Sequence, residues 1–312
     1  MNSKDWITIV NPAAGRGKIA KDWPEISALL KQHRISFIPF FTRRRLHASV
    51  LAKRKIEEGY SRIIVVGGDG TMNEVINGVF AQKRIPTTEV MLGLISAGTG
   101  NDWAKMFDIP SDYSSAVRTI RNQKTFIQDA GLVSYRRNGK EWKRYFINIA
   151  GMGFDARVAE RSNQLKTAGK SGAFVYFYSI FASLLNYKSK KAAVVIDDIT
   201  YMRRIFSLNV GIGKYNGGGM LQVPHAVADD GLYSITLIKK VGKLNVLANV
   251  GRLYNGKITA HSKVETYKAK TVRIEGNKGI AVETDGESLG YGPARFQIIP
   301  ASLKIIAGSK SA

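Results

Sequence analysis

The sequence contains no cysteine and only four histidines among its 312 residues. Without a thiol, the chain forms no disulfide and uses no cysteine nucleophile. The histidines lie at positions 33, 47, 225 and 261, which is not the spacing of a metal site. Functions that depend on zinc or on a thiolate are therefore excluded.

Long apolar runs are missing as well. No stretch approaches the ~20 apolar residues that span a bilayer. The amino end shows no signal-peptide pattern, because a strand-like run begins at Trp6. We therefore expect a cytoplasmic protein. The length predicts about two domains, each large enough to have its own core.

Acidic residues are scarce: 24 Asp and Glu stand against 47 Lys and Arg, a net charge of +23. The basic runs are scattered along the chain, and each one alone is typical of a solvated helix face or turn. The total excess favours an anionic partner. A lipid surface fits, since each nearby basic residue contributes about 1 kcal/mol there. Nucleic acid is the alternative, but the chain carries no recognised nucleic-acid motif.

The most informative pattern is a glycine loop, Gly67-Gly68-Asp69-Gly70-Thr71, between a β-branched run and the polar start of a predicted helix. Its glycines allow a sharp turn and a close backbone approach to a bound group. The amides at the helix start favour an anion such as phosphate. The alternative is a structural turn in which Asp69 and Thr71 only cap the helix.

Two further loops follow apolar runs in the same way. One spans residues 96–102 and ends in Asn101-Asp102, and the other spans residues 11–18. Three such loops predict a nucleotide cleft at the carboxyl edge of a parallel sheet. None of them is followed by Gly-Lys-Ser/Thr or reads G-x-G-x-x-G, so neither common phosphate fingerprint applies.

Hydrophobic periodicity predicts an α/β domain followed by a mainly β domain. Over residues 1–130, apolar strands alternate with segments of helical length, which is typical of a doubly wound, mostly parallel sheet. Over residues 131–300, strand pairs predominate, beginning with a hairpin at Asn138-Gly139, and predict a β-sandwich-like domain. The expected strands are 6–10, 36–41, 62–66, 90–95, 126–135, 142–150, 192–196, 205–211, 233–239, 271–275, 280–284 and 296–299.

Two features of the second domain have competing interpretations. Residues 151–156 have the form G-x-G-x-x-A, but no acidic residue follows about twenty positions on, which disfavours a dinucleotide site. Phe174, Tyr178, Phe181 and Leu185 recur at helical spacing. Such a stripe is typical of core packing, and it also suits a slot for an acyl chain.

The ordered motifs resemble those of the diacylglycerol-kinase-like lipid kinases, a family that includes sphingosine and ceramide kinases and is structurally akin to NAD kinases. The matching motifs are Asn-Pro-x-x-Gly at 11–15, Gly-Gly-Asp-Gly-Thr at 67–71 with Asn73-Glu74, Gly-Thr-Gly-Asn-Asp at 98–102, Asp-Asp-Gly at 229–231 and Asp-Gly-Glu at 285–287. They cover nearly the whole chain. One departure is Ser96, where the family usually has proline.

The resemblance implies roles for particular residues. Phosphate would be cradled by Gly68, Gly70 and Thr71, and the nucleotide held by Asn11, Thr42 and Thr99. Further nucleotide contacts would come from Gly67, Asn73, Glu74, Gly98, Asn101 and Asp102. Asp69 would organise the site or Mg²⁺, Glu287 would be the general base and Asp285 would orient it. A structural Mg²⁺ would lie at Asp229, Asp230 and Leu232, with waters and carbonyls completing its shell. Residues 301–312 would return to the first domain.

The expected function is therefore ATP- and Mg²⁺-dependent phosphorylation of a lipid hydroxyl, with diacylglycerol or a related lipid as substrate. The enzyme would work at the inner face of an anionic membrane, without nucleic acid, and a homodimer is left open. One alternative is a soluble kinase of the NAD-kinase type. The other, from a different class, is a basic nucleic-acid-binding protein without turnover.

Overall fold

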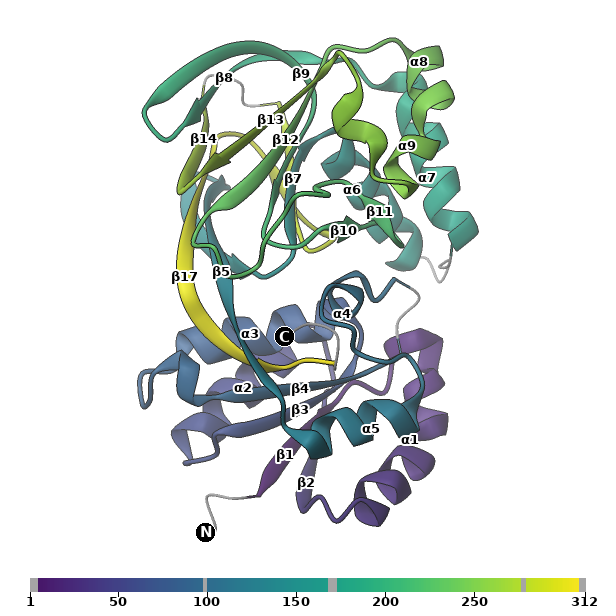
Figure 1. The fold of residues 1–312 in the computed structure, drawn as a ribbon, viewed down its shortest axis with the longest axis vertical. Coiled ribbons are helices and arrows are strands. Elements are labelled where there is room, and N and C mark those ends of the chain that lie inside the picture. Colours follow the sequence, from purple (N-terminus) through teal and green to yellow (C-terminus); the bar gives the residue numbers. More distant parts are fainter. Residues whose placement is uncertain (1–4, 98–99, 168–172, 276–278, 309–312) are drawn as a thin grey trace. The chain divides into compact units, whose positions relative to one another are not determined.

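The computed structural model describes residues 5–97, 100–167, 173–275 and 279–308, and the chain divides into two compact units (Figure 1). The first unit comprises Met1–Gln128 and Ala301–Ala312, and the second comprises Asp129–Pro300. The chain leaves the first unit within strand β5 (Thr125–Arg137) and returns to it within β17 (Ala294–Ile306).

The first unit is a parallel sheet with the strand order β17-β4-β3-β1-β2. Its strands are apolar and β-branched, and Ile63 to Val66 of β3 are fully buried, as expected for a sheet covered on both faces. Its elements are β1 (Trp6–Val10), α1 (Ala14–Gln32), β2 (Phe37–Phe41), α2 (His47–Glu57), β3 (Arg62–Gly67), α3 (Asp69–Ala81), η1 (Thr87–Glu89), β4 (Met91–Ser96), α4 (Asp102–Met106) and α5 (Tyr113–Asn122). The predicted doubly wound sheet is confirmed.

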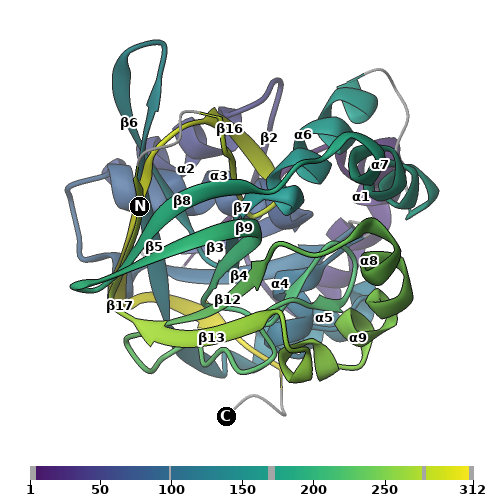
Figure 2. The same cartoon turned by 90° about the horizontal axis from the view of Figure 1, so that it is seen from above.

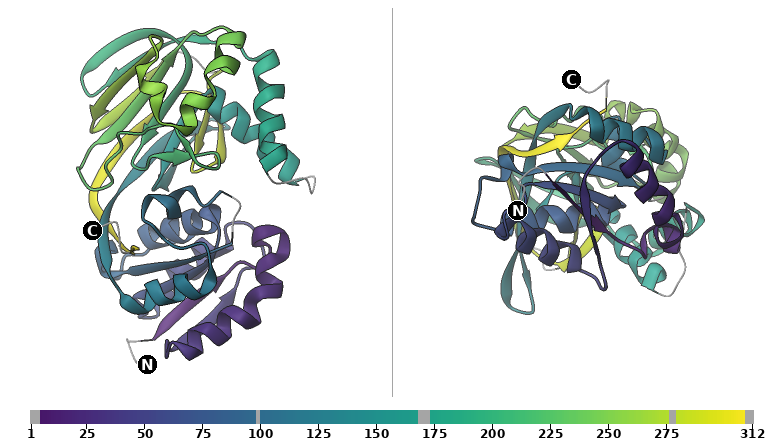
Figure 3. Two further views of the ribbon diagram at one scale, coloured as in Figure 1. Left: turned by 45° about the vertical axis from the view of Figure 1, so that its right-hand side comes forward. Right: turned by 90° about the horizontal axis from the view of Figure 1, so that it is seen from below.

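Two pairs of helices cover this sheet. Residues of α1 and α5, among them Ile26 and Val117, pack on Ile64 and Val66 in one buried cluster (Figures 1 and 3). Helices α2 and α3 pack against each other at Gly78, where an added Cβ would lie 2.3 Å from the Ser49 carbonyl oxygen. The sheet is thus enclosed, and its carboxyl edge carries the loops.

The second unit consists mainly of antiparallel strands, in the order β16-β15-β7-β9-β8-β14-β17. Strands β8, β9, β12 and β13 lie side by side in Figure 2, and β12 branches from β9. The Phe146 ring stacks on Tyr233, with 5.9 Å between centroids, and meets Phe296 edge-on at 6.2 Å. The predicted β-sandwich-like architecture is confirmed.

The elements of this unit after β5 are β6 (Lys140–Phe146), β7 (Ile149–Gly153), α6 (Phe154–Thr167), α7 (Ala173–Asn186), β8 (Lys190–Ile196), β9 (Ile199–Gly211), β10 (Tyr215–Asn216), β11 (Met220–Leu221), β12 (Tyr233–Lys239), α8 (Lys243–Asn249), α9 (Gly251–Tyr254), η2 (Lys257–Ala260), β13 (Val264–Ala269), β14 (Thr271–Glu275), β15 (Ala281–Thr284) and β16 (Glu287–Tyr291). The predicted hairpin at Asn138-Gly139 joins β5 to β6.

The prediction of one strand over 142–150 is wrong. Strand β6 ends at Phe146 and β7 begins at Ile149, because the amides of Ile147 and Asn148 donate to the Asp285 carboxylate, at 3.1 and 3.0 Å. Within the described ranges, no helix has both the length and the hydropathy needed to cross a membrane.

Candidate active-site residues

In the first unit, the candidate residues follow the carboxyl ends of β1, β2, β3 and β4. Because these strands are parallel neighbours in register, their loops meet at one edge of the sheet. The Thr42 amide donates to the Val10 carbonyl (2.8 Å), and the Asn11 amide donates to the Val66 carbonyl (2.9 Å). The loops after β1 and β2 are thus each hydrogen-bonded at their start to a carbonyl near the carboxyl end of the neighbouring strand.

Side chains then join three of these loops. Asn11 Nδ2 donates to Thr71 Oγ1 at 2.9 Å, and Thr42 Oγ1 donates to Asn11 Oδ1 at 3.4 Å. Asn11, Thr42 and Thr71 thus form a continuous chain of hydrogen bonds. The structure brings together three residues to which the family resemblance assigns contacts with the nucleotide or its phosphates.

Glycines allow the backbone to pack closely at this edge. An added Cβ on Gly67 would lie 2.5 Å from Thr71 Oγ1, and one on Gly15 would lie 2.5 Å from the Ala97 carbonyl oxygen. Gly68 precedes α3 as its N-cap, and its carbonyl accepts from the Thr71 amide at 2.9 Å. The first turn of α3, which includes Asp69 and the exposed Gly70, lies at the same edge of the sheet.

Asp69 connects this turn to the loop after β4. Its Oδ2 accepts from the Asp102 amide at 3.0 Å. An added Cβ on Gly100 would be 3.5 Å from Asp102 Oδ2 and 3.6 Å from Asp69 Oδ2. Asn101 has a left-handed backbone, and its Oδ1 is buried with no hydrogen-bond partner among the residues that the structure describes. Gly98 and Thr99, also predicted here, lie outside the described residues.

These groups fit a hard cation that is shared with a phosphate. Mg²⁺ is usually held by one or two carboxylates and by substrate phosphates, and Asp69 and Asp102 both approach the same glycine. The described part of the chain holds no group of three or more side-chain ligands for a metal. A cation at this position would therefore depend on the nucleotide for most of its shell.

Asn73 and Glu74 follow the loop at residues 67–71 in α3 and make contacts within α3 and with α2. Asn73 is fully buried in α3, where its Oδ1 accepts from Asn77 Nδ2 at 3.3 Å. The Glu74 carboxylate accepts from the amides of Leu46 (2.8 Å) and Ala48 (3.2 Å), at the start of α2. Both side chains thus make structural contacts that fix the α3 helix and its neighbour.

In the second unit, the acidic turn joins β15 to β16. Asp285 and Gly286 have left-handed backbones, and Glu287 is the half-buried first residue of β16. Besides accepting from the amides of Ile147 and Asn148, Asp285 donates its own amide to the Ile149 carbonyl at 2.9 Å. These contacts fix the turn on which Glu287 is carried.

Sequence reasoning missed a third carboxyl beside this turn. Glu283 is fully buried, and its Oε2 accepts from the Gly286 amide at 2.8 Å. Burial raises the pKa of Glu283 well above its usual range, and the nearby charges of Asp285 and Asp155 act in the same direction. A charged residue inside the apolar run 280–284 was the available signal.

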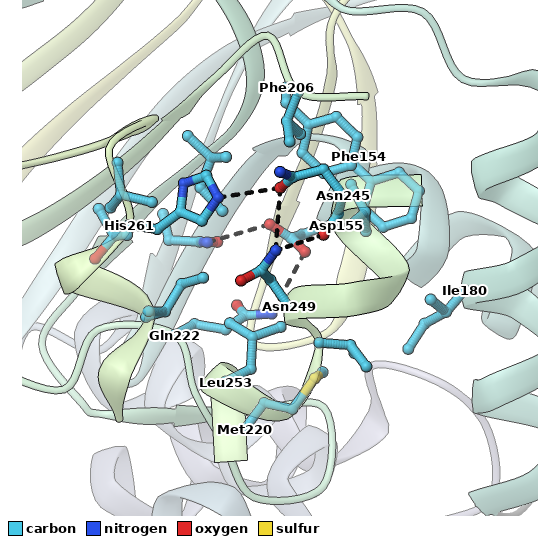
Figure 4. A pocket seen from close by; sticks show the side chains of 18 of the residues that line it. Phe154, Asp155, Ile180, Phe206, Met220, Gln222, Asn245, Asn249, Leu253 and His261 are labelled. Atoms are coloured by element: carbon cyan, nitrogen blue, oxygen red, sulfur yellow. Dashed lines mark hydrogen bonds between the residues drawn. The ribbon is translucent and has the colours of Figure 1, made fainter. Parts of the chain in front are cut away.

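An apolar pocket lies beside α6 in the same unit (Figure 4). Its cavity volume is about 80 Å³. Its walls include Phe154, Val158, Ile180, Phe206, Val246 and Leu253. Of the predicted stripe, Tyr178, Phe181 and Leu185 are exposed, the side chain of Phe174 lies outside the described residues, and Ile180 of the same helix faces the pocket.

One end of this pocket is polar. Asp155 accepts from Ser207 Oγ, from Asn209 Nδ2 at 3.1 Å and from Gln222 Nε2 at 3.4 Å. Figure 4 labels Asp155 and Gln222 in the pocket. Burial raises the pKa of Asp155, while the hydrogen bonds from Ser207 and Asn209 oppose that rise. Asn209 Oδ1 is buried without a hydrogen-bond partner among the described residues. The pocket thus has apolar walls and a hydrogen-bonding end.

Asp155 belongs to the G-x-G-x-x-A motif, which proves not to be a dinucleotide fingerprint. Strand β7 does lead directly into α6, but it pairs with β9 and β15 in antiparallel fashion, so no parallel βαβ unit is formed. The glycines serve packing instead. An added Cβ on Gly151 would lie 2.5 Å from Glu283 Oε1.

The acidic turn expected to hold a structural Mg²⁺ makes other contacts. Asp230 Oδ2 pairs with Lys268 Nζ at 2.7 Å, and its Oδ1 accepts from the Leu232 amide at 3.0 Å. Asp229 is exposed. Because the Lys268 ammonium engages one Asp230 oxygen and the Leu232 amide engages the other, this arrangement does not fit a resident cation.

Comparison with known proteins agrees with the two units. The family model "Diacylglycerol kinase catalytic domain" matches residues 5–133, and "YegS C-terminal NAD kinase beta sandwich-like domain" matches residues 148–307. A diacylglycerol kinase of Staphylococcus haemolyticus is 30% identical over 293 residues, covering 92% of this chain and 83% of its relative.

Solved structures share the fold. A diacylglycerol kinase from Bacillus anthracis has a TM-score of 0.74 at 22% identity, over 99% of this chain and 98% of that one. Yeast NADH kinase, in complex with NADH, has a TM-score of 0.53 at 11% identity, over 99% of this chain and 85% of that one. With both family models matched in order and a curated relative aligned over most of its length, the chain belongs to the diacylglycerol-kinase-like family of kinases.

Proposed function

We propose that this protein is an ATP- and Mg²⁺-dependent lipid kinase that phosphorylates a lipid hydroxyl, with diacylglycerol or a close relative as acceptor. Membership of the family supports phosphotransfer from a nucleotide. The observation that carries the choice of a lipid over a water-soluble acceptor is the apolar pocket beside α6, which has a hydrogen-bonding end.

In this proposal, the nucleotide phosphates bind the backbone of Gly68 and Gly70 and the side chain of Thr71. The first amides of α3 lie there, and a helix N-terminus favours an anion. Asn11 and Thr42 brace Thr71 through their hydrogen bonds, while Asn101 offers an oxygen to the nucleotide. Positioning is the main requirement of phosphoryl transfer, since the protein takes little part in covalent chemistry.

Asp69 and Asp102 would hold Mg²⁺. The ion would supply neutralisation of the charge on the transferring phosphoryl group. The 3.0 Å hydrogen bond between the Asp102 amide and Asp69 fixes the Asp69 carboxylate in one orientation. Such preorganisation reduces the rearrangement needed when the nucleotide binds.

Part of the lipid tail would enter the apolar pocket, with the polar part of the lipid toward Asp155 and Asn209. Twelve of the residues that line the pocket are apolar and seven are polar, so the pocket offers a surface for a lipid tail beside groups that can bind a polar part of the lipid.

Glu287 would accept the proton of the lipid hydroxyl, and Asp285 would hold the Glu287 side chain in position. The Asp285 carboxylate is already engaged by two backbone amides, which suits a supporting role. A carboxylate within hydrogen-bond reach of an alcohol can take its proton as the bond to phosphorus forms. The net charge of +23 would hold the enzyme at an anionic membrane surface.

A panel of acceptors in mixed micelles tests the proposal. Diacylglycerol, sphingosine, ceramide and NAD⁺ would each be offered with labelled ATP, with Mg²⁺ or with EDTA. We expect label in a lipid phosphate only when Mg²⁺ is present. An Ile180→Glu variant, which places a charge in the pocket wall, should raise the KM for lipid and leave ATP binding unchanged. Label in NAD⁺ and in no lipid would refute the proposal.

A further inference from the structure

A second, basic pocket lies on another side of α6. Its volume is about 430 Å³, enough for a phosphate group together with part of the molecule that carries it. Its charged lining consists of Arg157, Glu160, Arg161, Lys188 and Lys190. Four cations therefore face a space that contains one carboxylate. None of these side chains has a role in the proposed reaction.

Only one of the four cationic side chains forms an ion pair with the carboxylate that lines the pocket. Arg157 pairs with Glu160 at 2.8 Å, and Tyr291 hydrogen-bonds to both of them. Within the part of the chain that the structure describes, no carboxylate forms an ion pair with Arg161, Lys188 or Lys190. A net positive cavity is thus left for an anion from outside the chain.

The geometry suits an oxyanion with several acceptor oxygens. Arg157 and Arg161 are four residues apart on α6 and so lie on the same side of the helix. The guanidinium of Arg161 sits over the Tyr178 ring, with 5.6 Å to the centroid, which limits its freedom. Lys190 Nζ donates to the Gly279 carbonyl at 2.6 Å. Guanidinium and ammonium groups together are the usual recognition set for phosphate.

The same helix also reaches the acidic turn. Asn163 Nδ2 of α6 donates to the Gly286 carbonyl at 3.0 Å, beside Glu287. The hairpin that carries this turn pairs Ala281 with Tyr291 at its other end, and both residues line the basic pocket. A ligand bound there would therefore contact both α6 and the base of the β15–β16 hairpin.

We propose that the basic pocket binds a phosphate group, as a phosphomonoester or phosphodiester, and that the bound ligand holds α6 against the β15–β16 hairpin and so orders the Asp285–Glu287 turn. The phosphate belongs either to a water-soluble ester or to a lipid headgroup. Any effect of this ordering on kinase turnover rests on the proposed function, in which Glu287 is the general base. Binding and ordering of the turn do not, and they are measured without turnover.

The test compares three forms of the full-length protein. The first is the wild type, and the second is Arg161→Gln/Lys188→Gln, which removes two cations from the pocket. The control is Arg137→Gln/Lys140→Gln, which removes the same charge from the exposed turn of the β5–β6 hairpin, where neither residue lines the pocket. Thermal melts establish that each variant is folded, and the single variant Lys188→Gln, at an exposed position, serves if the double variant is not.

Two probes separate the sources of phosphate. Calorimetric titration with glycerol 3-phosphate measures a soluble ester, and sedimentation with phosphatidylcholine vesicles containing or lacking phosphatidic acid measures a headgroup. Loss of two charged contacts should weaken binding at least about tenfold. Hydrogen exchange of residues 285–291 should slow when the effective probe is bound to the wild type.

Each outcome decides the matter. A titration lost in the pocket variant and kept in the control supports a soluble ligand. Dependence of vesicle binding on the same two residues, without a titration signal, supports a lipid headgroup. Equal binding of both probes by the two double variants overturns the site. Binding that leaves the exchange of residues 285–291 unchanged overturns the ordering of the turn.

Discussion

Replacing Gly67 with alanine should damage the phosphate loop without unfolding the chain. The added Cβ would lie 2.5 Å from Thr71 Oγ1, 2.7 Å from Thr71 Cβ and 3.1 Å from Thr71 Cγ2. Thr71 cannot move away freely, since it is 5% exposed, lies in the first turn of α3 and accepts from Asn11 Nδ2. The clash must therefore displace the loop or the start of α3.

Overpacking of this kind costs about 1–3 kcal/mol. If the whole cost falls on the loop conformation that binds ATP, the dissociation constant rises about 5- to 150-fold, because 1.4 kcal/mol is a factor of ten. If it also falls on folding, the melting temperature of the variant drops by about 2–4 °C for each kcal/mol. The two effects are measured by ATP titration and by calorimetry.

Gly242→Ala is the matched control. Gly242 has φ −74°, a conformation open to alanine, and a Cβ there meets nothing within 4 Å. Its ATP affinity and melting temperature should stay near those of the wild type. Wild-type melting and wild-type ATP affinity in Gly67→Ala would refute the geometry of the loop. A lower melting temperature with unchanged ATP affinity would refute its role in phosphate binding.

Four further predictions concern the charged groups. Asp69→Ala should abolish ATP hydrolysis and lipid phosphorylation while the circular dichroism spectrum stays unchanged, and near-normal kcat would reduce the loop to a structural turn. Glu287→Gln should lower kcat by about 10² or more, with ATP binding nearly unchanged, and a wild-type kcat in this variant combined with a loss in Asp69→Asn would move the base to Asp69. Burial raises the pKa of Glu283, so the folded state binds this proton more tightly than the unfolded state, and the stability should fall as the pH rises above about 4.5. In thermal melts, Glu283→Gln should reduce the slope of this fall by up to about 1.4 kcal/mol per pH unit. An unchanged slope would contradict the assignment. Sedimentation with vesicles should increase with anionic lipid and weaken steeply with salt, whereas salt-insensitive or absent binding would leave the +23 charge without a membrane role.

The parallel sheet and its loops were predictable because local sequence determines both. A β-branched run that ends in glycine identifies a strand and its carboxyl end, and parallel neighbours bring those ends together. Asn11 and Thr71 were therefore assigned to one edge from motifs far apart in the sequence, Thr42 was added only by the family resemblance, and the hydrogen bonds of all three lie at that edge. The nucleotide roles of these residues stay predictions.

Contacts that depend on antiparallel register were not predictable. Strand β13 was missed because charged residues interrupt its alternation, and Arg203 pairs with one of them, Glu265, at 3.0 Å. Its pairing places Lys268 opposite Ser234, within reach of Asp230. Strands β10 and β11, with two residues each, are too short for periodicity to detect.

The polar end of the apolar pocket was missed for a similar reason. Asp155, Ser207 and Asn209 come from α6 and β9, more than fifty positions apart in the sequence, and they meet only after those elements pack. Glu283 was visible as an acidic residue in an apolar run, but nothing local indicated that Gly151 would leave room for its side chain. Tertiary packing supplies both features.

The parallel pairing of β17 with β4 bears on how the chain is made. Lys304 and Ile305 pair with Met91 and Leu92, and Thr87 Oγ1 donates to the Ser302 carbonyl across 215 positions of sequence. At about 5–20 residues per second, a ribosome needs on the order of 10–40 s to synthesise that interval. Throughout that time the outer edge of β4 has no partner strand, and an open apolar edge is prone to pair with other chains. The nascent amino-terminal sheet therefore keeps one unpaired edge until residues 304–306 have been synthesised.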